Sequence, residues 1–339
     1  MSATRFVDRE QTIKSLFQVR GVAADGTVAL RRRLRRRDVP GFFAGLPPCL
    51  VGIEASRSAH HWARELVALG HTVRLMPPSY AKPYVKRNKN DAADAEAICE
   101  AVTRPTMRFV PVKSRERQAA ILPHRARDLL IRQRTRLVNA LRAHLAEFGI
   151  VGPRGLWNVK RLVDAVRDGG GLPAAARRAL TLPVGQLESL GGQVAAVEKD
   201  IRAWHRQHEA CRRLAAVPGI GPITASAIVA TVPDLTTFSS GRGFAAWLGL
   251  TPRQNSSGGK ERLGGISKRG DRYLRRLLFS GALAVIFRER RREVPSGWLG
   301  QLLRRRPVKV AAVALANKTA RIVWAMLARG QTYHAAAVA

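Results

Sequence analysis

Three acidic residues in the first third of the chain have the type and spacing of a metal site. Glu54 lies near the end of the apolar stretch CLVGIEA, where an ionised carboxylate is costly unless it meets a cation or a metal. Asp91 and Asp94 are three residues apart at the start of an expected helix, so they share one of its faces. Carboxylate oxygens suit Mg²⁺, and two such ions can activate the attacking oxygen and stabilise the leaving oxygen in phosphoryl transfer. The pattern also fits a strand end paired with an arginine, followed by acids that complement a helix dipole.

A second group with chemical potential is a loop rich in serine, glycine and cations. It reads RQNSSGGK and ends at Lys260, and Lys268 and Arg269 follow shortly after. A serine flanked by glycines can approach a phosphate, and nearby cations can stabilise the charge that develops there. An ordinary flexible loop has the same composition, so this pattern alone leaves both interpretations open.

The stretch LAAVPGIGP predicts a helix-hairpin-helix turn. Gly219 and Gly221 would expose backbone N–H groups at the start of the following helix, which suits a phosphate without reading base sequence. We expect these glycines, with Lys260, Lys268 and Arg269, to contact nucleic acid. The alternative is a plain tight turn between two packed helices.

Basic residues dominate the charge of the chain. Its 339 residues include 59 Lys plus Arg and 24 Asp plus Glu, a net charge of +35, and a fold this basic repels itself unless a polyanion is present. The basic residues are spread along the sequence, which favours extended contact with nucleic-acid phosphates over a single basic tail. No apolar run reaches the roughly 18 residues of a spanning helix, and the first residues lack the apolar segment of a signal peptide. We therefore expect no membrane partner and a cytoplasmic protein that acts at the nucleoid.

The cysteines and histidines do not predict a metal site. The three cysteines, Cys49, Cys99 and Cys211, lie far apart and have no ligand spacing. His60 and His61 are adjacent, so on a helix they point about 100° apart. We expect the cysteines to be buried thiols in a reducing compartment.

The elements that must position these groups follow a recognisable order. The first two expected elements are strands at residues 15–22 and 27–34, joined by a turn at Asp25-Gly26. They are followed by a buried strand at 49–55, a helix at 58–69, a strand after His71 and a helix from Asp91 to about Thr103. This is the order of an α/β RNase H-like fold, although a Rossmann-type domain would look similar. No GxGxxG follows the first strand, which weakens the nucleotide-binding alternative.

The rest of the chain is expected to be mainly helical. Long charged helical patterns cover residues 115–148 and 187–214, with a Gly- and Pro-rich interruption at 149–183, and predict a coiled-coil arm. After Ala215, short helices with Gly-rich turns predict a compact domain around one polar loop. The expected domains are 1–105 (α/β), 106–205 (helical arm) and 206–339 (mainly α, with the helix-hairpin-helix and the serine loop).

Several long stretches resemble the one-ten family of insertion-sequence transposases, relatives of the Piv-type DNA invertases. The shared stretches are GIEAS at 52–56, KNDAADAEAI at 89–98, PGIGPITA at 218–225, and AAWLGLTPRQNSSGGK at 245–260 with GISKRGDRYLRR after it. They stand in the order typical of the family. The resemblance runs from about Lys14 to Tyr333.

The resemblance implies an RNase H-like, RuvC-like domain with a D-E-D-D metal site for Mg²⁺, in which Glu54, Asp91 and Asp94 take the last three places. It also implies that Ser257 attacks DNA and holds it as a phosphoserine, with Ser256 as the neighbouring control. Members of the family are associated with a structured guide RNA from the element's own non-coding end. They assemble as homo-oligomers, dimers or tetramers, in which carboxylates of one protomer meet the serine of another.

One departure from the family pattern concerns the first aspartate, which belongs in a strand motif resembling GIDxAK. Counting back from Lys14 puts Gln11 at that position, and counting forward from Phe6 puts Glu10 there. Asp8 and Glu10 share a face with Phe6 if the segment is a strand, so either is a substitute. Loss of one carboxylate would disable a two-metal site, so an inactive copy is an alternative.

Three functions therefore remain open on the sequence. The first is a transposase or site-specific recombinase that uses Mg²⁺ and a serine nucleophile. The second is a non-catalytic nucleic-acid-binding relative that kept its basic surface. The third is a junction nuclease that uses carboxylates alone.

Overall fold

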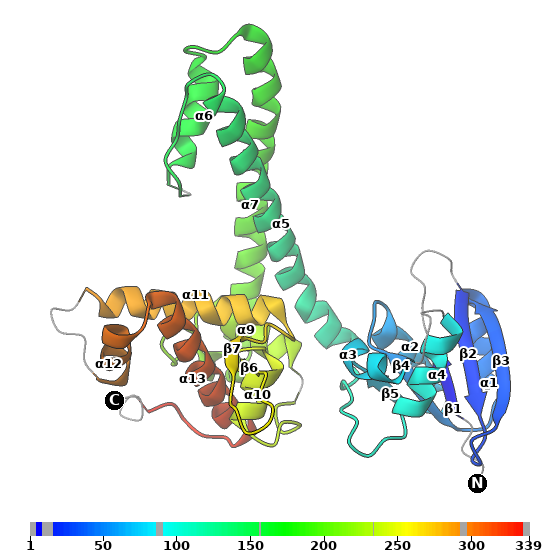
Figure 1. Ribbon diagram of the computed structural model, residues 1–339. Coiled ribbons are helices and arrows are strands. Elements are labelled where there is room, and N and C mark those ends of the chain that lie inside the picture. Colours follow the sequence, from blue (N-terminus) through cyan, green and yellow to red (C-terminus); the bar gives the residue numbers. More distant parts are fainter. Residues whose placement is uncertain are drawn as a thin grey trace. The chain divides into compact units, whose positions relative to one another are not determined.

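The structure is a computed structural model that describes residues 5–8, 16–85, 91–155, 157–232, 234–291 and 297–334, without the side chains of residues 5–8, 91 and 92. It contains mixed α/β and all-helical parts (Figure 1). The chain divides into two compact units, Met1–Arg115 and Glu116–Ala339.

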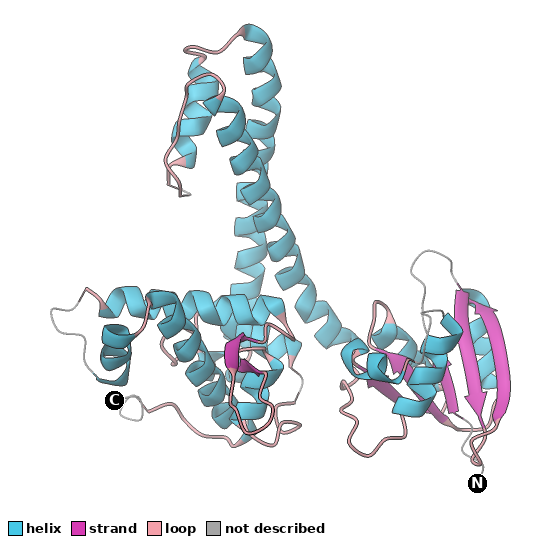
Figure 2. Cartoon of the chain, in the orientation of Figure 1, coloured by secondary structure: helices cyan, strands magenta, loops and turns pink. Residues whose placement is uncertain are grey.

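The first unit is built on a mixed sheet. Its strands are β1 (Arg5–Asp8), β2 (Leu16–Val22), β3 (Val28–Arg35), β4 (Leu50–Glu54) and β5 (Thr72–Met76). In the described part of this unit their order is β3-β2-β1-β4-β5, and Figure 2 shows them in one sheet. The pairs β1–β2 and β2–β3 are antiparallel, whereas β1–β4 and β4–β5 are parallel.

Helices cover both faces of this sheet because the strand residues alternate. On one face, α1 (Val39–Ala44) and α2 (Ala59–Ala68) bury Phe17, Val19 and Ile53 together with Trp62. On the other face lies α4 (Asp91–Ala101), with a smaller core around Met76, Ile98 and Val102. The short helices η1 (Arg36–Asp38), α3 (Pro78–Ala81) and η2 (Lys82–Tyr84) connect these elements.

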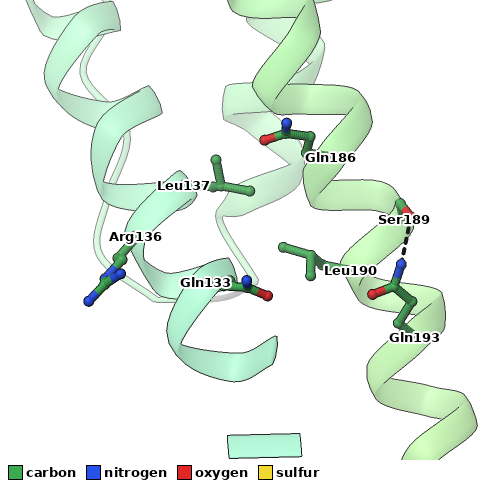
Figure 3. Close-up of a pocket in the computed structure, with 7 residues that line it drawn as sticks. All are labelled: Gln133, Arg136, Leu137, Gln186, Ser189, Leu190 and Gln193. Atoms are coloured by element: carbon green, nitrogen blue, oxygen red, sulfur yellow. Dashed lines mark hydrogen bonds between the residues drawn. The ribbon is translucent and has the colours of Figure 1, made fainter. Parts of the chain in front are cut away.

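The second unit begins with a helical arm. Its helices are α5 (Arg115–Ala146), α6 (Val159–Asp168) and α7 (Ala174–Gln207). Apolar residues from all three, including Leu141, Leu162 and Val184, form its core. A pocket of about 420 Å³ lies between α5 and α7 beside this core. Leu137 and Leu190 point toward one another across it (Figure 3).

The arm differs from the expectation at its second long helix. The Gly- and Pro-rich interruption at 149–183 was predicted to be non-helical, but α6 lies within it and α7 runs through Pro183. Proline removes one backbone hydrogen bond from a helix and is normally costly there. Leu180, Val184 and Leu187 are buried in the arm core on both sides of Pro183, and this packing outweighs the loss.

A compact helical bundle completes the second unit. Its helices are α8 (Glu209–Leu214), α9 (Pro222–Thr231), α10 (Gly241–Trp247), α11 (Arg272–Glu289), α12 (Gly297–Arg305) and α13 (Val308–Ala328), and it carries the strand pair β6 (Pro252–Gln254) and β7 (Leu263–Ile266). A single apolar cluster includes Phe244, Leu278 and Val323. Among the described helices, α13 is long and apolar enough to cross a membrane by composition, but half of it is buried, which is typical of a core helix.

Candidate active site and nucleic-acid interface

Glu54 ends a central strand of the first unit. Val51 and Ile53 of β4 are buried against α1 and α2, so the alternation of the strand turns Gly52 and Glu54 toward the face that carries α4. Glu54 is half-buried, and the strand ends directly after it, where the Ser56 N–H donates to the Glu54 carbonyl at 2.7 Å. The carboxylate therefore stands at the edge of the apolar core.

Close packing at Gly52 holds the end of α4 against this strand. A Cβ atom at Gly52 would lie 3.0 Å from Val102 Cγ2 and 3.1 Å from Met76 Cε. Such contacts are tighter than most real Cβ contacts, so the absence of a side chain at this position lets the strand and the helix end approach. The glycine of the GIEAS stretch therefore has a packing role two residues before Glu54.

Two arginines of the sheet fasten α4 to it. Arg20 of β2 forms an ion pair with Glu96 of α4 at 2.8 Å, and the side chain of Arg20 is only 12% exposed. Arg74 of β5 donates to the carbonyl of Val102 at 3.1 Å, just beyond the last turn of α4, where a cation complements the helix dipole. Neither arginine was singled out from the sequence, because only the strand pairing reveals that both face α4.

Asp94 lies on α4, whose neighbours Ala95 and Ile98 are buried against the sheet. Asp94 is half-buried, and its Oδ2 atom is shielded from solvent. Asp91 begins the same helix one turn earlier, but its side chain lies outside the described residues. The carboxylate oxygens of Glu54 and Asp94 are of the ligand type that Mg²⁺ prefers.

The first carboxylate position of the expected metal site falls on β1 or just after it. Asp8 ends β1 and pairs in parallel register with Ile53, the residue before Glu54. The side chain of Asp8 and all of Glu10 and Gln11 lie outside the described residues. Within the part of the chain that is described, no group of three or more His, Cys, Asp and Glu side chains could hold a metal. The set of Glu54, Asp91 and Asp94 therefore stays a prediction.

The predicted serine loop is an ordered hairpin on the second unit. Asn255 N–H donates to the Arg262 carbonyl at 2.9 Å, and Lys260 N–H donates to the Ser257 carbonyl at 3.1 Å. Gly258 and Gly259 have φ values of 55° and 74°, the two positive values that a tight type I′ hairpin turn requires. The SSGGK sequence therefore makes a defined turn with Ser257 at its corner, not only a flexible loop.

The two adjacent serines differ in their hydrogen bonds. The Ser256 Oγ atom accepts a hydrogen bond from Arg262 N–H at 3.2 Å. The hydroxyl of Ser257 makes no hydrogen bond to any described residue, and both serines are exposed. Ser257 is therefore the serine whose hydroxyl is available to a ligand.

Tight backbone packing supports the base of the hairpin. Gly270 has a φ of 86°, and a Cβ atom there would clash with the Trp247 carbonyl oxygen. Arg275 of α11 donates to the carbonyls of Leu248 and Arg269 at 2.8 and 3.1 Å. The segments that begin and end the hairpin are thereby held together on α11.

The basic residues predicted to contact nucleic acid lie in the turn of this hairpin and just after its second strand. The expected cations Lys260, Lys268 and Arg269 are all exposed. Lys268 has a φ of 55°, a left-handed conformation that is uncommon for residues other than glycine. Its N–H donates to the Gly249 carbonyl at 3.2 Å, which helps to hold this conformation.

The two glycines of the PGIG turn have different environments. A Cβ atom at Gly219 would lie 2.8 Å from the Gly281 carbonyl oxygen, so this glycine serves the packing of the turn on α11. Gly221 is exposed with nothing near its Cβ position, and α9 begins directly after it. The tight-turn interpretation thus accounts for Gly219, while Gly221 remains accessible to a phosphate.

Comparison with known proteins supports a single family along nearly the whole chain. The family model described as "Transposase IS116/IS110/IS902 family" matches residues 211–295, and a DEDD transposase model for IS110 matches residues 22–150. A "Probable family 20 transposase" of Pseudomonas aeruginosa is 52% identical over 94% of this chain and 96% of its own length. The transposase for the insertion element IS1328 of Yersinia enterocolitica is 41% identical over 94% of this chain and 96% of its own length. The transposase for IS1111A of Coxiella burnetii is 38% identical over 96% of this chain and 90% of its own length.

Proposed function

This chain belongs to the IS116/IS110/IS902 family of insertion-sequence transposases, and we propose that it cuts and rejoins the DNA of its element through Ser257 and a carboxylate metal site. Family membership itself implies action on DNA. The chemical route, its cofactor and its nucleic-acid partners are the proposal. The observation that carries it is the exposed hydroxyl of Ser257 at the corner of an ordered, cation-rich hairpin.

The first unit is proposed to be an RNase H-like, RuvC-like domain. Three antiparallel strands followed by two parallel ones, in the order β3-β2-β1-β4-β5, support this proposal over the all-parallel sheet of a Rossmann-type domain. The proposed domains are an α/β domain (1–105), an arm (106–205) and a serine-bearing domain with a helix-hairpin-helix (206–339).

Mg²⁺ is the proposed metal, held by Glu54, Asp91 and Asp94. When bound, it would supply positive charge to the oxygens of the reacting phosphate. The residues of this chain hold the site in place: Gly52 permits the close approach of the strand and the helix end, and Arg20 and Arg74 fix α4 on the sheet.

The serine step is a transfer of a phosphoryl group. The Ser257 Oγ atom forms a bond to phosphorus, the bond from phosphorus to a deoxyribose oxygen breaks, and the serine proton ends on that oxygen. The reverse step with a different strand end rejoins the DNA and frees the serine. The exposed cations Lys260, Lys268 and Arg269 supply positive charge near the phosphate.

Further partners are part of the proposal and rest on the resemblance of the shared stretches. We propose that a structured guide RNA from the element binds the basic surface of the protein, and that homo-dimers or tetramers bring the carboxylates of one protomer to the serine of another. The net charge of +35 supports extended contact with polyanions and action at the nucleoid.

The test is covalent trapping. Purified protein with its guide RNA, element DNA and Mg²⁺ should form a protein–DNA adduct that survives denaturation, and Ser257→Ala should remove it. Ser256→Ala is the matched control, because its hydroxyl is already bonded to the Arg262 backbone, and it should keep the adduct. If Ser257→Ala leaves the adduct or the strand exchange intact, the serine mechanism is wrong.

One observation favours a second candidate. The GIDxAK motif that would carry the first aspartate is absent from the sequence. The second candidate is therefore a relative that lacks a complete metal site and binds nucleic acid without cutting it. Steeply salt-dependent binding with no cleavage in Mg²⁺ or Mn²⁺ would support this candidate. A free 5′-phosphate product without an adduct would instead support a carboxylate-only junction nuclease.

A further inference from the structure

We infer that a groove beside the serine hairpin binds a single strand of DNA, and this inference rests on the proposed function because the groove shares residues with that hairpin. The groove has a volume of about 1010 Å³ and lies between β6–β7, α12 and one face of α13. Its described lining is Leu250, Pro252, Gly264, Gly265, Ile266, Lys268, Trp298, Lys309, Val310, Val313, Ala314, Asn317, Lys318, Arg321, Ile322 and Ala325.

The floor of the groove is an apolar helix face. Val310, Val313, Ala314 and Ile322 recur at helical spacing along α13 and line the groove. Val310 is 50% exposed, although the opposite side of the same helix is buried in the bundle core. The volume is at the upper end of the range of about 300–1,000 Å³ for a small-molecule pocket, so an extended ligand fits better.

The polar groups of the groove are cations and one amide. Lys268, Lys309, Lys318 and Arg321 line it, and none of the described lining residues is acidic. The Lys318 ammonium lies 4.7 Å from the centre of the Trp298 ring, so this cation is held against an aromatic surface.

This combination selects a nucleic-acid strand over a protein partner. A second copy of the chain would bring few acids to the four cations, because it carries 24 acidic residues against 59 basic ones. A single strand offers apolar base faces to the floor and phosphates to the cations. In a duplex the bases are stacked inside, so the apolar floor would have no partner.

The position of the groove selects DNA as the source of that strand. Lys268, Gly264 and Ile266 belong to the hairpin that carries Ser257 and to its base, and they also line the groove. Exchange of strand ends at a serine requires that an end leaves its complement before it is rejoined. We assign the groove to that separated end.

The experiment measures binding of a labelled oligothymidylate to the full-length protein by fluorescence anisotropy over a range of salt concentrations. The double variant Lys309→Gln with Arg321→Gln should flatten the dependence of log affinity on log salt by about 1.4, since each lost phosphate contact removes about 0.7 for a single strand. Val310→Glu should weaken binding at least about tenfold through like-charge repulsion. Neither change should alter binding of a blunt duplex by a comparable factor.

Matched controls carry the same chemical changes on the arm. They are the double variant Lys160→Gln with Arg161→Gln and the single variant Val151→Glu, all at exposed positions that do not line the groove. Each should bind oligothymidylate like the unaltered protein, apart from a uniform charge effect that also appears with duplex. Circular dichroism melting shows whether each variant is folded, and Val310→Gln replaces Val310→Glu if the latter is not.

The outcomes separate the inference from the proposed function. Equal affinity and an equal salt slope for the groove variants overturn the inference, even if Ser257→Ala still removes the covalent adduct. Equal losses for single strand and duplex overturn it too. So does a change in oligomeric mass with unchanged oligonucleotide binding, because the occupant is then a second copy. If the groove variants bind as expected but Ser257→Ala leaves the covalent adduct intact, the proposed function is overturned and the inference about the groove is not.

Discussion

Arg20 on β2 and Glu96 on α4 form an ion pair of 2.8 Å across the face of the sheet. The pair joins two segments that are 76 residues apart in the chain, and α4 also carries Asp91 and Asp94. Within the first unit, this contact therefore helps to set where two of the proposed metal ligands lie relative to the strand that ends at Glu54.

Arg20→Gln should loosen α4. We expect a loss of about 1–2 kcal/mol in the free energy of unfolding, less than for a fully buried pair because Glu96 is 39% exposed. Hydrogen exchange followed by mass spectrometry should show faster exchange in α4. Arg104→Gln is the control, since its pair with Glu100 is half-exposed on both sides and should change little. Equal protection of α4 in both variants would contradict the anchoring role.

Gly52→Ala should strain the contact between β4 and the end of α4. The added Cβ would lie 3.0 Å from Val102 Cγ2, and overpacking of this kind costs about 1–3 kcal/mol. Val102→Ala removes Cγ2, the nearest of the crowding atoms, and leaves Met76 Cε at 3.1 Å, so the cost of Gly52→Ala should be smaller in that background but not abolished. Urea unfolding of the four proteins in this double-mutant cycle gives the coupling energy. Additive effects would mean that the two residues do not crowd one another.

Gly270→Ala should disable the serine hairpin. Its φ of 86° is unfavourable for alanine, and the new Cβ would meet the Trp247 carbonyl. We expect loss of the covalent adduct together with faster proteolysis between Thr251 and Ser267. Gly170→Ala, on the arm, is the control, because nothing lies within 4 Å of its Cβ position and its φ is not positive. An intact adduct in Gly270→Ala would show that the base of the hairpin is not required.

Glu54→Gln should abolish cleavage while the protein remains folded. The change keeps the side-chain shape and removes the charge that would hold Mg²⁺, so we expect a loss of more than about 100-fold in adduct formation. Glu65→Gln, on α2 at the opposite face of the sheet, should retain activity. Chelation of Mg²⁺ should reproduce the Glu54→Gln result in the unaltered protein. Retained cleavage in Glu54→Gln would remove this residue from the proposed site.

The buried His124 should make stability depend on pH. Burial, with a smaller contribution from Arg127, lowers the pKa of His124 from 6.5 to about 4. The unfolded chain therefore takes up this proton at a higher pH than the folded chain, so the contribution is complete above pH 6.5 and is lost as pH falls toward 4. The loss should be about 3 kcal/mol.

Unfolding with urea at several pH values checks this prediction. His124→Gln should flatten the fall in stability between pH 6.5 and 4, whatever its effect at neutral pH. His144→Gln, on an exposed position of the same helix, should leave the slope unchanged. An unaltered slope in His124→Gln would mean that this histidine is not buried as described.

Local pattern determined much of this protein from the sequence alone. The turn at Asp25-Gly26 is present, with Thr27 N–H donating to Asp25 Oδ1 at 2.9 Å, because that signal acts within a few residues. The strand predicted at 27–34 is likewise present as β3, and its Leu34 is buried. The charge excess and the long shared stretches pointed to a DNA-acting family for the same reason, since neither depends on how distant segments meet.

Tertiary structure decided what the local pattern could not. Pro183 signals a helix break, but apolar packing in the arm keeps α7 continuous through it. Gly219 fits a phosphate-binding turn by sequence, yet its closest neighbour is Gly281 of α11. The Arg20–Glu96 pair and the groove along α13 depend on residues far apart in the chain. Their energies exist only once those segments are packed together, so no short window of sequence contains them.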